Sequence, residues 1–169
     1  KVISLTILFT INKNTILYTY NNILKIVYIT NARLPTEKAH GVQIIKMIEA
    51  LSSLNNEVIL ISRKRIQNEI SHKTNVFNFY NVKNSFQVTR IKKFNSFPLG
   101  INYYLYSLIS FFKAYRSSNL IISRNYFIIF LCTIFKKKCI FELHHDISTE
   151  SRLINVIFKC YNVFKKKSL

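Results

Sequence analysis

The residues best suited to do chemistry in this sequence are Glu142 and His144. They stand two positions apart, so in an extended segment both side chains point to the same side. A carboxylate beside an imidazole can accept, donate or hold a proton near neutral pH. Both residues follow the apolar run 139–141, at the carboxyl end of a predicted strand. We expect His144 and Glu142 to be catalytic.

His144, His145 and Asp146 are also a cluster of potential zinc ligands. A zinc site needs further Cys or His ligands at a characteristic spacing. Neither the four histidines nor the three cysteines of the chain supply that spacing, so no metal ion is expected. For His144, a structural histidine is the alternative to a catalytic one.

The glycines exclude two large enzyme classes. With only Gly41 and Gly100, the chain contains neither a Gly-x-Gly-x-x-Gly fingerprint nor a P-loop, which excludes nicotinamide enzymes and P-loop ATPases. Gly41 stands at the start of a predicted helix, where backbone N–H groups attract phosphate and a glycine lets a ligand come close. An ordinary capping loop is the alternative, because glycine is also an accepted N-cap.

Short apolar runs alternate with amphipathic segments from Lys25 onward, and this alternation predicts the fold. The predicted strands are 25–30, 58–62, 86–91, 119–123 and 139–143, and the predicted helices are 41–53, 101–115, 126–135 and from 148 onward. We expect an α/β, Rossmann-like parallel sheet with helices on both faces. Ligands of such sheets bind beyond the carboxyl ends of the strands. The segments at those ends are 31–41, 62–63, 123–125 and 144–146.

The chain is strongly basic. Among 169 residues, 25 are Lys or Arg and 7 are Asp or Glu, which gives a net charge of +18. Such a charge favours nucleic acid, acidic lipid or phosphorylated substrates as partners. The alternative is a coding bias toward Lys, Asn, Ile, Phe and Tyr without any functional meaning. A hydrophobic content of 49% excludes a disordered chain, and three cysteines argue for a reducing compartment rather than a disulfide scaffold.

Residues 1–24 differ from the regular pattern that follows. The apolar run 2–11 is ended by Lys13 and Asn14 without a small-residue cleavage site, so it is a weak signal peptide. No apolar run reaches the roughly 18 residues of a spanning helix. We expect residues 1–24 to form an extension that stays apart from a domain at 25–169.

Two segments resemble glycosyltransferases of the GT-B fold, family 4 (group 1). The first, 25–63, contains an Arg-x-Pro at Arg33–Pro35, then Val-Gln at 42–43 and Asn-Glu-Val at 56–58. The second, 119–146, contains NLIISRN and CIFELHHD, which are similar to the strand-Ser-Arg and Tyr-Glu-x-His-Asp segments of the family. The sequence departs from the family at His145, where members commonly have Asp, and it lacks their second Rossmann domain with its paired glutamates.

The resemblance implies the N-terminal, acceptor-side domain of a retaining enzyme, without the C-terminal donor domain. Such an enzyme moves a hexosyl group from a nucleotide-sugar donor to a glycan or lipid-linked acceptor and needs no cofactor. The implied substrate-binding residues are Arg33, His40, Gly41, Arg124 and Asn125. His144 would face the donor sugar and Glu142 would support that strand end. The 169 residues alone are expected to be inactive and cytoplasmic, with a basic surface that, if functional, docks peripherally on the anionic inner face of the membrane.

A different class of function is a non-catalytic basic module that binds nucleic acid or anionic membrane. Basic and aromatic residues interleave in 90–94 and 161–167, a mixture that can contact phosphates and stack on bases. No helix-turn-helix, RNP or zinc-finger signature accompanies them, so nucleic acid is not the expected partner.

Overall fold

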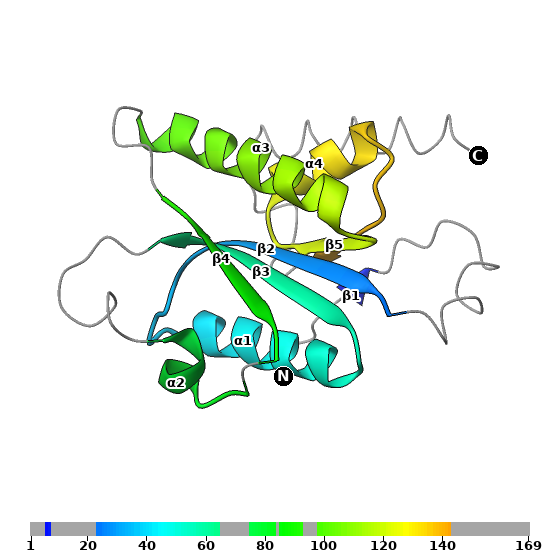
Figure 1. Cartoon of the computed structure of the whole chain (residues 1–169). Coiled ribbons are helices and arrows are strands. Elements are labelled where there is room, and N and C mark those ends of the chain that lie inside the picture. Colours follow the sequence, from blue (N-terminus) through cyan, green and yellow to red (C-terminus); the bar gives the residue numbers. More distant parts are fainter. Residues whose placement is uncertain (1–5, 8–22, 65–74, 84, 93–97, 143–169) are drawn as a thin grey trace.

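The computed structural model describes residues 6–7, 23–64, 75–83, 85–92 and 98–142. The elements along the chain are β1 (Thr6–Ile7), β2 (Lys25–Leu34), α1 (Ala39–Ser53), β3 (Glu57–Lys64), α2 (Val76–Tyr80), β4 (Gln87–Ile91), α3 (Leu99–Ser117), β5 (Leu120–Ser123), α4 (Tyr126–Ile134) and β6 (Cys139–Glu142) (Figure 1). The predicted helix from 148 onward, together with His144, His145 and Asp146, lies outside the described residues.

The strands form one sheet in the order β1-β6-β5-β2-β3-β4. Strands β2 to β6 pair in parallel, whereas the two residues of β1 pair antiparallel to Glu142 and Phe141 of β6. The predicted fold class, a Rossmann-like parallel sheet with helices on both faces, is confirmed. Within the extension expected at 1–24, Thr6 and Ile7 pair at the edge of the sheet and do not form a central strand.

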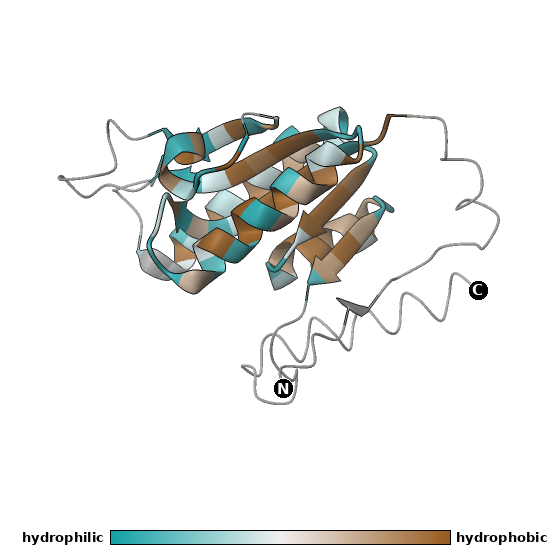
Figure 2. Cartoon of the chain, turned by 90° about the horizontal axis from the view of Figure 1, so that it is seen from below, coloured by the Kyte–Doolittle hydropathy of each residue, from teal (hydrophilic) through white to brown (hydrophobic). Residues whose placement is uncertain are grey.

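Helices cover both faces of the sheet: α1 and α2 lie on one side, and α3 and α4 on the other (Figure 1). Alternation along β2 divides its side chains between two cores, because Tyr28 packs on the α1 side and Val27 and Ile29 on the α3 side. The middle parts of β2, β3 and β5 are hydrophobic (Figure 2), as expected for strands buried on both faces, whereas β4 at the edge alternates with polar residues. Each fully buried Ile contributes roughly 1.5–3 kcal/mol to stability.

The residues 31–34 were expected in a loop, but they continue β2. An irregularity after Ile29 shifts the register, and Arg33 and Leu34 then pair with Arg63 and Lys64 of β3. The polar residues Asn31 and Arg33 gave this stretch the composition of a loop, although the strand only passes through a bulge there. Because β2 continues to Leu34, it ends beyond its neighbour β5, whose pairing stops at Ile29.

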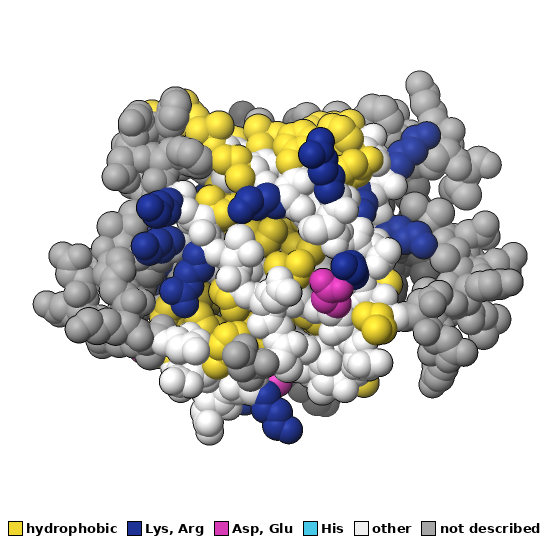
Figure 3. Space-filling view, viewed as in Figure 1, with side chains coloured by type: hydrophobic (Ala, Val, Ile, Leu, Met, Phe, Trp, Pro, Cys, Tyr) yellow, Lys and Arg dark blue, Asp and Glu magenta, His cyan; other side chains and the backbone are white. Residues whose placement is uncertain are grey.

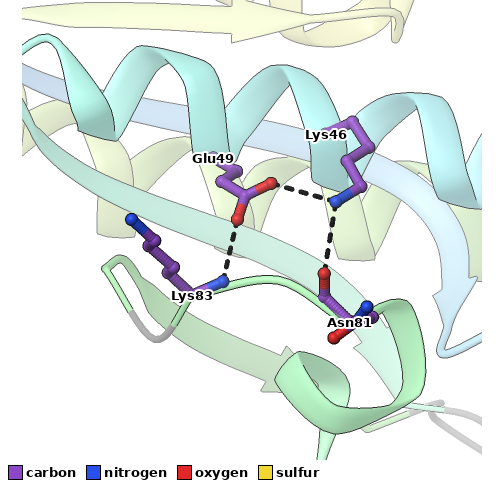
Figure 4. Close-up of polar contacts among 4 residues, drawn as sticks. All are labelled: Lys46, Glu49, Asn81 and Lys83. Atoms are coloured by element: carbon purple, nitrogen blue, oxygen red, sulfur yellow. Dashed lines mark hydrogen bonds and ion pairs between the residues drawn. The ribbon is translucent and has the colours of Figure 1, made fainter.

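A polar network fixes the connection after α2 to helix α1 (Figure 4). The Glu49 carboxylate accepts a hydrogen bond from the backbone N–H of Lys83 at 2.8 Å and pairs with Lys46 at 3.1 Å. The Lys46 ammonium also donates to the Asn81 carbonyl oxygen at 3.3 Å. Glu49 therefore has a structural role.

Candidate functional site

The carboxyl ends of β2 and β5 lie at the switch point of the sheet. From β2 the chain moves outward through β3 to β4, and it then returns to β5 on the opposite side of β2. Open α/β sheets bind ligands where the strand order reverses in this way. Any site built on this fold is therefore expected around residues 30–33 and 123–125.

Asn125 joins the two strands at the switch point. Its side-chain N–H₂ donates to Asn31 at 3.2 Å and to Ser107 at 2.7 Å. Its side-chain oxygen accepts from the Tyr103 hydroxyl at 2.7 Å and from the backbone N–H groups of residues 127 and 128, which caps α4. Asn125 is only 2% exposed, so its amide holds the edge together and does not face solvent.

Two of its partners, Asn31 and Tyr103, are half-buried and lie nearer the surface. Burial raises the pKa of Tyr103 to about 12, so its hydroxyl stays protonated and remains a hydrogen-bond donor at neutral pH. The side chains of Asn31 and Tyr103 are therefore held in fixed positions at the switch point.

Arg33 and Arg63 stand side by side at the carboxyl edge. They are Cα partners on the neighbouring strands β2 and β3, so their side chains start from the same face, the one covered by α3. Arg33 is exposed, whereas Arg63 is half-buried, with its guanidinium carbon 4.7 Å from the centre of the Tyr106 ring. That is a cation–π distance, and one Arg63 nitrogen also donates to the Asn102 carbonyl at 3.3 Å.

The charge of Arg63 has no carboxylate partner among the described residues. Its Nε is buried and unpaired there, and the ion pairs of this part of the chain involve other cations. Burial, with repulsion from Arg33, lowers the pKa of Arg63. A desolvated cation beside a second one is unfavourable unless an anion compensates it, so this pair is suited to hold a negatively charged ligand.

Lysine and arginine side chains gather over the end of β3 (Figure 3). The residues of this basic edge are Arg33, Arg63, Lys64, Arg90 and Lys92. Of the four glutamates in the described part of the chain, Glu49, Glu57 and Glu142 form ion pairs elsewhere. Glu37, the fourth, is exposed in loop 35–38, which follows β2. The described residues at the carboxyl edge near β3 therefore carry a net positive charge.

Arg124 and Glu142 also meet, but on the opposite face of the sheet. Their ion pair is 2.6 Å long, and the second Glu142 oxygen accepts from the Tyr28 hydroxyl at 2.8 Å. Tyr28 is fully buried, and its burial together with the negative charge of Glu142 raises its pKa. The Glu142 carboxylate is thus fixed at the end of β6, with both oxygens engaged.

Gly41 is buried, and other groups of this chain fill the space beside its Cα. A Cβ atom there would come within 2.4 Å of Thr36 Cγ2 and 2.7 Å of the Tyr80 hydroxyl. Tyr80 in turn donates to the Thr36 carbonyl at 2.7 Å and accepts from the Thr36 N–H at 2.6 Å. The glycine lets loop 35–38 pack against α1, so its smallness serves packing. His40, its neighbour, is exposed in the first turn of α1.

The expected site residues thus fall into two groups. Arg124 and Glu142 lie together on the α1 face, Arg33 lies on the α3 face, and Asn125 links the strands between them. Tyr103, Tyr106 and the pairing of Arg63 with Arg33 were not expected from the sequence. The spacing of Tyr103 and Tyr106 could have indicated these two residues, because residues three positions apart lie on the same side of a helix. His144 lies outside the described residues.

No group of three His, Cys, Asp or Glu side chains that could hold a metal ion occurs among the described residues. Within the same part of the chain, no helix is long and apolar enough to span a membrane. Cys132 and Cys139 are free thiols.

No protein-family model matches the chain, and no curated protein does. Among solved structures, it is similar to the C-terminal domain of a hydrogenase from Pyrococcus furiosus, with a TM-score of 0.46 and 10% identity. That alignment covers 70% of this chain and 91% of the hydrogenase domain.

Proposed function

We propose that this chain is the N-terminal, acceptor-side domain of a retaining family 4 glycosyltransferase. The enzyme moves a hexosyl group from a nucleotide-sugar to a glycan or lipid-linked acceptor. The resemblance of 25–63 and 119–146 to that family motivates the proposal. The observation that carries it is the Arg33–Arg63 pair, which has no carboxylate partner in the described part of the chain and lies at the carboxyl edge of a parallel sheet.

In this proposal the arginine pair holds the diphosphate of the donor. Negative charge grows on the leaving phosphate as its bond to the sugar breaks, and fixed cations aimed at that charge stabilise the transition state. Guanidinium groups suit this task because two N–H groups can bind two phosphate oxygens at once. The Tyr106 ring already orders Arg63, which reduces the entropy lost on binding.

Glu142 acts here as a positioning residue. Its two oxygens are engaged by Arg124 and Tyr28, so it is better placed to anchor the strand end than to exchange protons with a substrate. The segment anchored in this way leads into His144, the residue proposed to face the donor sugar.

The test is sugar transfer with and without a second domain. The proposal requires a second Rossmann domain that supplies the other wall of the donor site. The purified 169-residue chain should release no nucleoside diphosphate from a panel of nucleotide-sugars, because one wall cannot enclose the donor. The two domains together should release nucleoside diphosphate, and His144→Ala should abolish this release. Turnover by this chain alone, or no turnover by the two domains together, contradicts the proposal.

The net charge of +18 favours a second candidate, a non-catalytic module that binds nucleic acid. Such binding falls steeply with salt, because it releases counterions from the phosphates. Tight, salt-dependent binding to DNA or RNA, without competition from a nucleotide-sugar, would favour this candidate over the enzyme.

A further inference from the structure

The outer surface at the carboxyl ends of α3 and α4 exposes large apolar side chains. Phe112 is 50% exposed, Tyr115 37%, Ile134 50% and Phe135 40%. Scattered apolar residues are common on protein surfaces, but a contiguous group of this size marks an interaction site. We call these four residues and the lysines and arginine around them the aromatic–basic surface.

The exposed rings are held in place from below. Phe111 is fully buried, and its ring centre lies 5.5 Å from that of Phe112, 5.6 Å from Tyr115 and 5.3 Å from Phe135. The rings of Phe112 and Phe135 are also 5.8 Å apart, which joins α3 to the end of α4. Because Phe111 already fills the core beneath them, these rings cannot turn inward to escape water.

One apolar row of α3 is exposed at both of its ends and half-buried between them, where Leu108 packs against the core. Ile101, Leu105, Leu108 and Phe112 recur at the spacing i, i+4, i+7 and i+11, which places them on one side of the helix. Ile101 at the far end of this row is also exposed. The space-filling view shows hydrophobic side chains along α3 with Lys and Arg side chains beside them (Figure 3).

Among the described residues, the charged side chains of α3, α4 and the turn after α4 all carry a positive charge. Lys113, Arg116, Lys136 and Lys138 are exposed, and the segment 98–138 contains no Asp or Glu. Lys137 is fixed by hydrogen bonds to the carbonyl oxygens of Tyr115 and Ser118. A second copy of this chain would present the same positive charge, so self-association through this surface is electrostatically unfavourable.

We propose that the aromatic–basic surface docks the protein on an anionic lipid bilayer. Aromatic rings prefer the level of the headgroups, aliphatic side chains reach the acyl boundary, and lysines and arginine contact acidic lipids. Each such cation strengthens binding by a factor of about five. Exposed Ile134 favours a lipid surface over nucleic acid, because aliphatic side chains offer bases no stacking partner.

The surface lies at the opposite end of α3 from the candidate site. Asn102 and Tyr106 in the first half of the helix contact Arg63, whereas Phe112 and Tyr115 lie in the second half. The proposal does not depend on the proposed enzymatic function, and its test measures no activity.

Phe112→Trp tests the docking directly, because the chain contains no Trp and the new indole reports only from this surface. We expect its emission to shift to the blue with vesicles of phosphatidylcholine and phosphatidylglycerol, and to be quenched when their acyl chains are brominated. The matched control is Leu54→Trp at the end of α1, where an exposed apolar residue lies outside the surface. Its emission should not change.

Charge is tested by pairs of substitutions. Lys113→Gln with Lys136→Gln should weaken vesicle binding about 25-fold, from two factors of about five. Lys38→Gln with Lys83→Gln removes the same charge elsewhere and should have little effect. High salt should weaken binding of the unchanged chain, because it screens the attraction.

Any of the following results would overturn the proposal. One is equal quenching of the Phe112→Trp and Leu54→Trp variants, or equal weakening of vesicle binding by the two double lysine substitutions. Another is equal binding to pure phosphatidylcholine vesicles, or no binding to the acidic ones. The third is an emission shift of the Phe112→Trp variant caused by protein concentration or by DNA in the absence of vesicles, since that would assign the surface to a second copy or to nucleic acid.

Discussion

The side-chain amide of Asn125 donates to Asn31 at 3.2 Å and so ties the end of β5 to the extended end of β2. This hydrogen bond crosses the point where the strand order of the sheet reverses. Arg33 and Arg124 are the cations that could hold a ligand on the two sides of this hydrogen bond. The strands that position them cannot separate without breaking the bond.

Asn125→Ala should lower the free energy of unfolding by about 2–3 kcal/mol. The change removes the N-cap of α4, worth about 1 kcal/mol, and leaves the buried polar groups of Ser107 and Tyr103 without their partner. Urea unfolding of this variant and of Asn78→Ala, an exposed control on α2, measures the difference. Equal stability of the two variants would show that the Asn125 network contributes nothing.

The Arg124–Glu142–Tyr28 group should behave as one coupled unit. Arg124→Gln leaves the partly buried Glu142 carboxylate without its cation and should cost about 2–3 kcal/mol, while Tyr28→Phe removes one hydrogen bond and should cost about 1 kcal/mol. The loss in the double variant should differ from the sum of the two, because both side chains hold the same carboxylate. Strict additivity in denaturant unfolding would mean that the three side chains are independent.

Gly41→Ala should destabilise the fold by about 1–3 kcal/mol, because the added methyl group collides with Thr36 and the Tyr80 hydroxyl. Gly100→Ala is the matched control: nothing lies within 4 Å of its added Cβ, and Ala favours a helix over Gly by roughly 1 kcal/mol. The two substitutions should therefore shift the thermal midpoint in opposite directions. A shift of the same sign for both would contradict the packing described for loop 35–38.

Acid should weaken the link between α1 and the segment after α2. The Lys83 N–H, and then Lys46, lower the pKa of Glu49 below its ordinary value of 4.5. A lowered pKa in the folded state means that the stabilisation is present above the ordinary value and is lost as the pH falls through the lowered one. The free energy of unfolding of Glu49→Gln should therefore fall less steeply at acidic pH than that of the unchanged chain. An equally steep fall would show that the contacts of Glu49 do not stabilise the fold.

The sequence predicted the core of this fold well because buried strands are short and β-branched. The runs around Val27 and Ile59 stand out from the polar segments between them, and so the order of β2 to β6 with α1, α3 and α4 was readable, whereas β1 and α2 were not predicted. The continuation of β2 to Leu34 was not, because a bulge separates its two parts and its polar residues are typical of loops.

The candidate site was predicted only in part. Arg124, Asn125 and Glu142 could be named because they follow strand ends, but the roles of the last two depend on distant partners. The Tyr28–Glu142 contact joins residues 114 positions apart, and the Arg33–Arg63 pairing depends on the shifted register of β2. Neither leaves a local pattern in the sequence.

The side-chain N–H signal of Arg63 reports directly whether the Arg33–Arg63 pair binds the anionic part of a nucleotide-sugar. This Nε is buried and has no partner in the described part of the chain, so its resonance should respond to a bound diphosphate. On titration with nucleotide-sugars the signal should shift and saturate. Arg63→Gln should weaken binding about tenfold or more, whereas Arg116→Gln, at the far end of α3, should not. A signal that does not move, or equal weakening by both variants, would contradict the account.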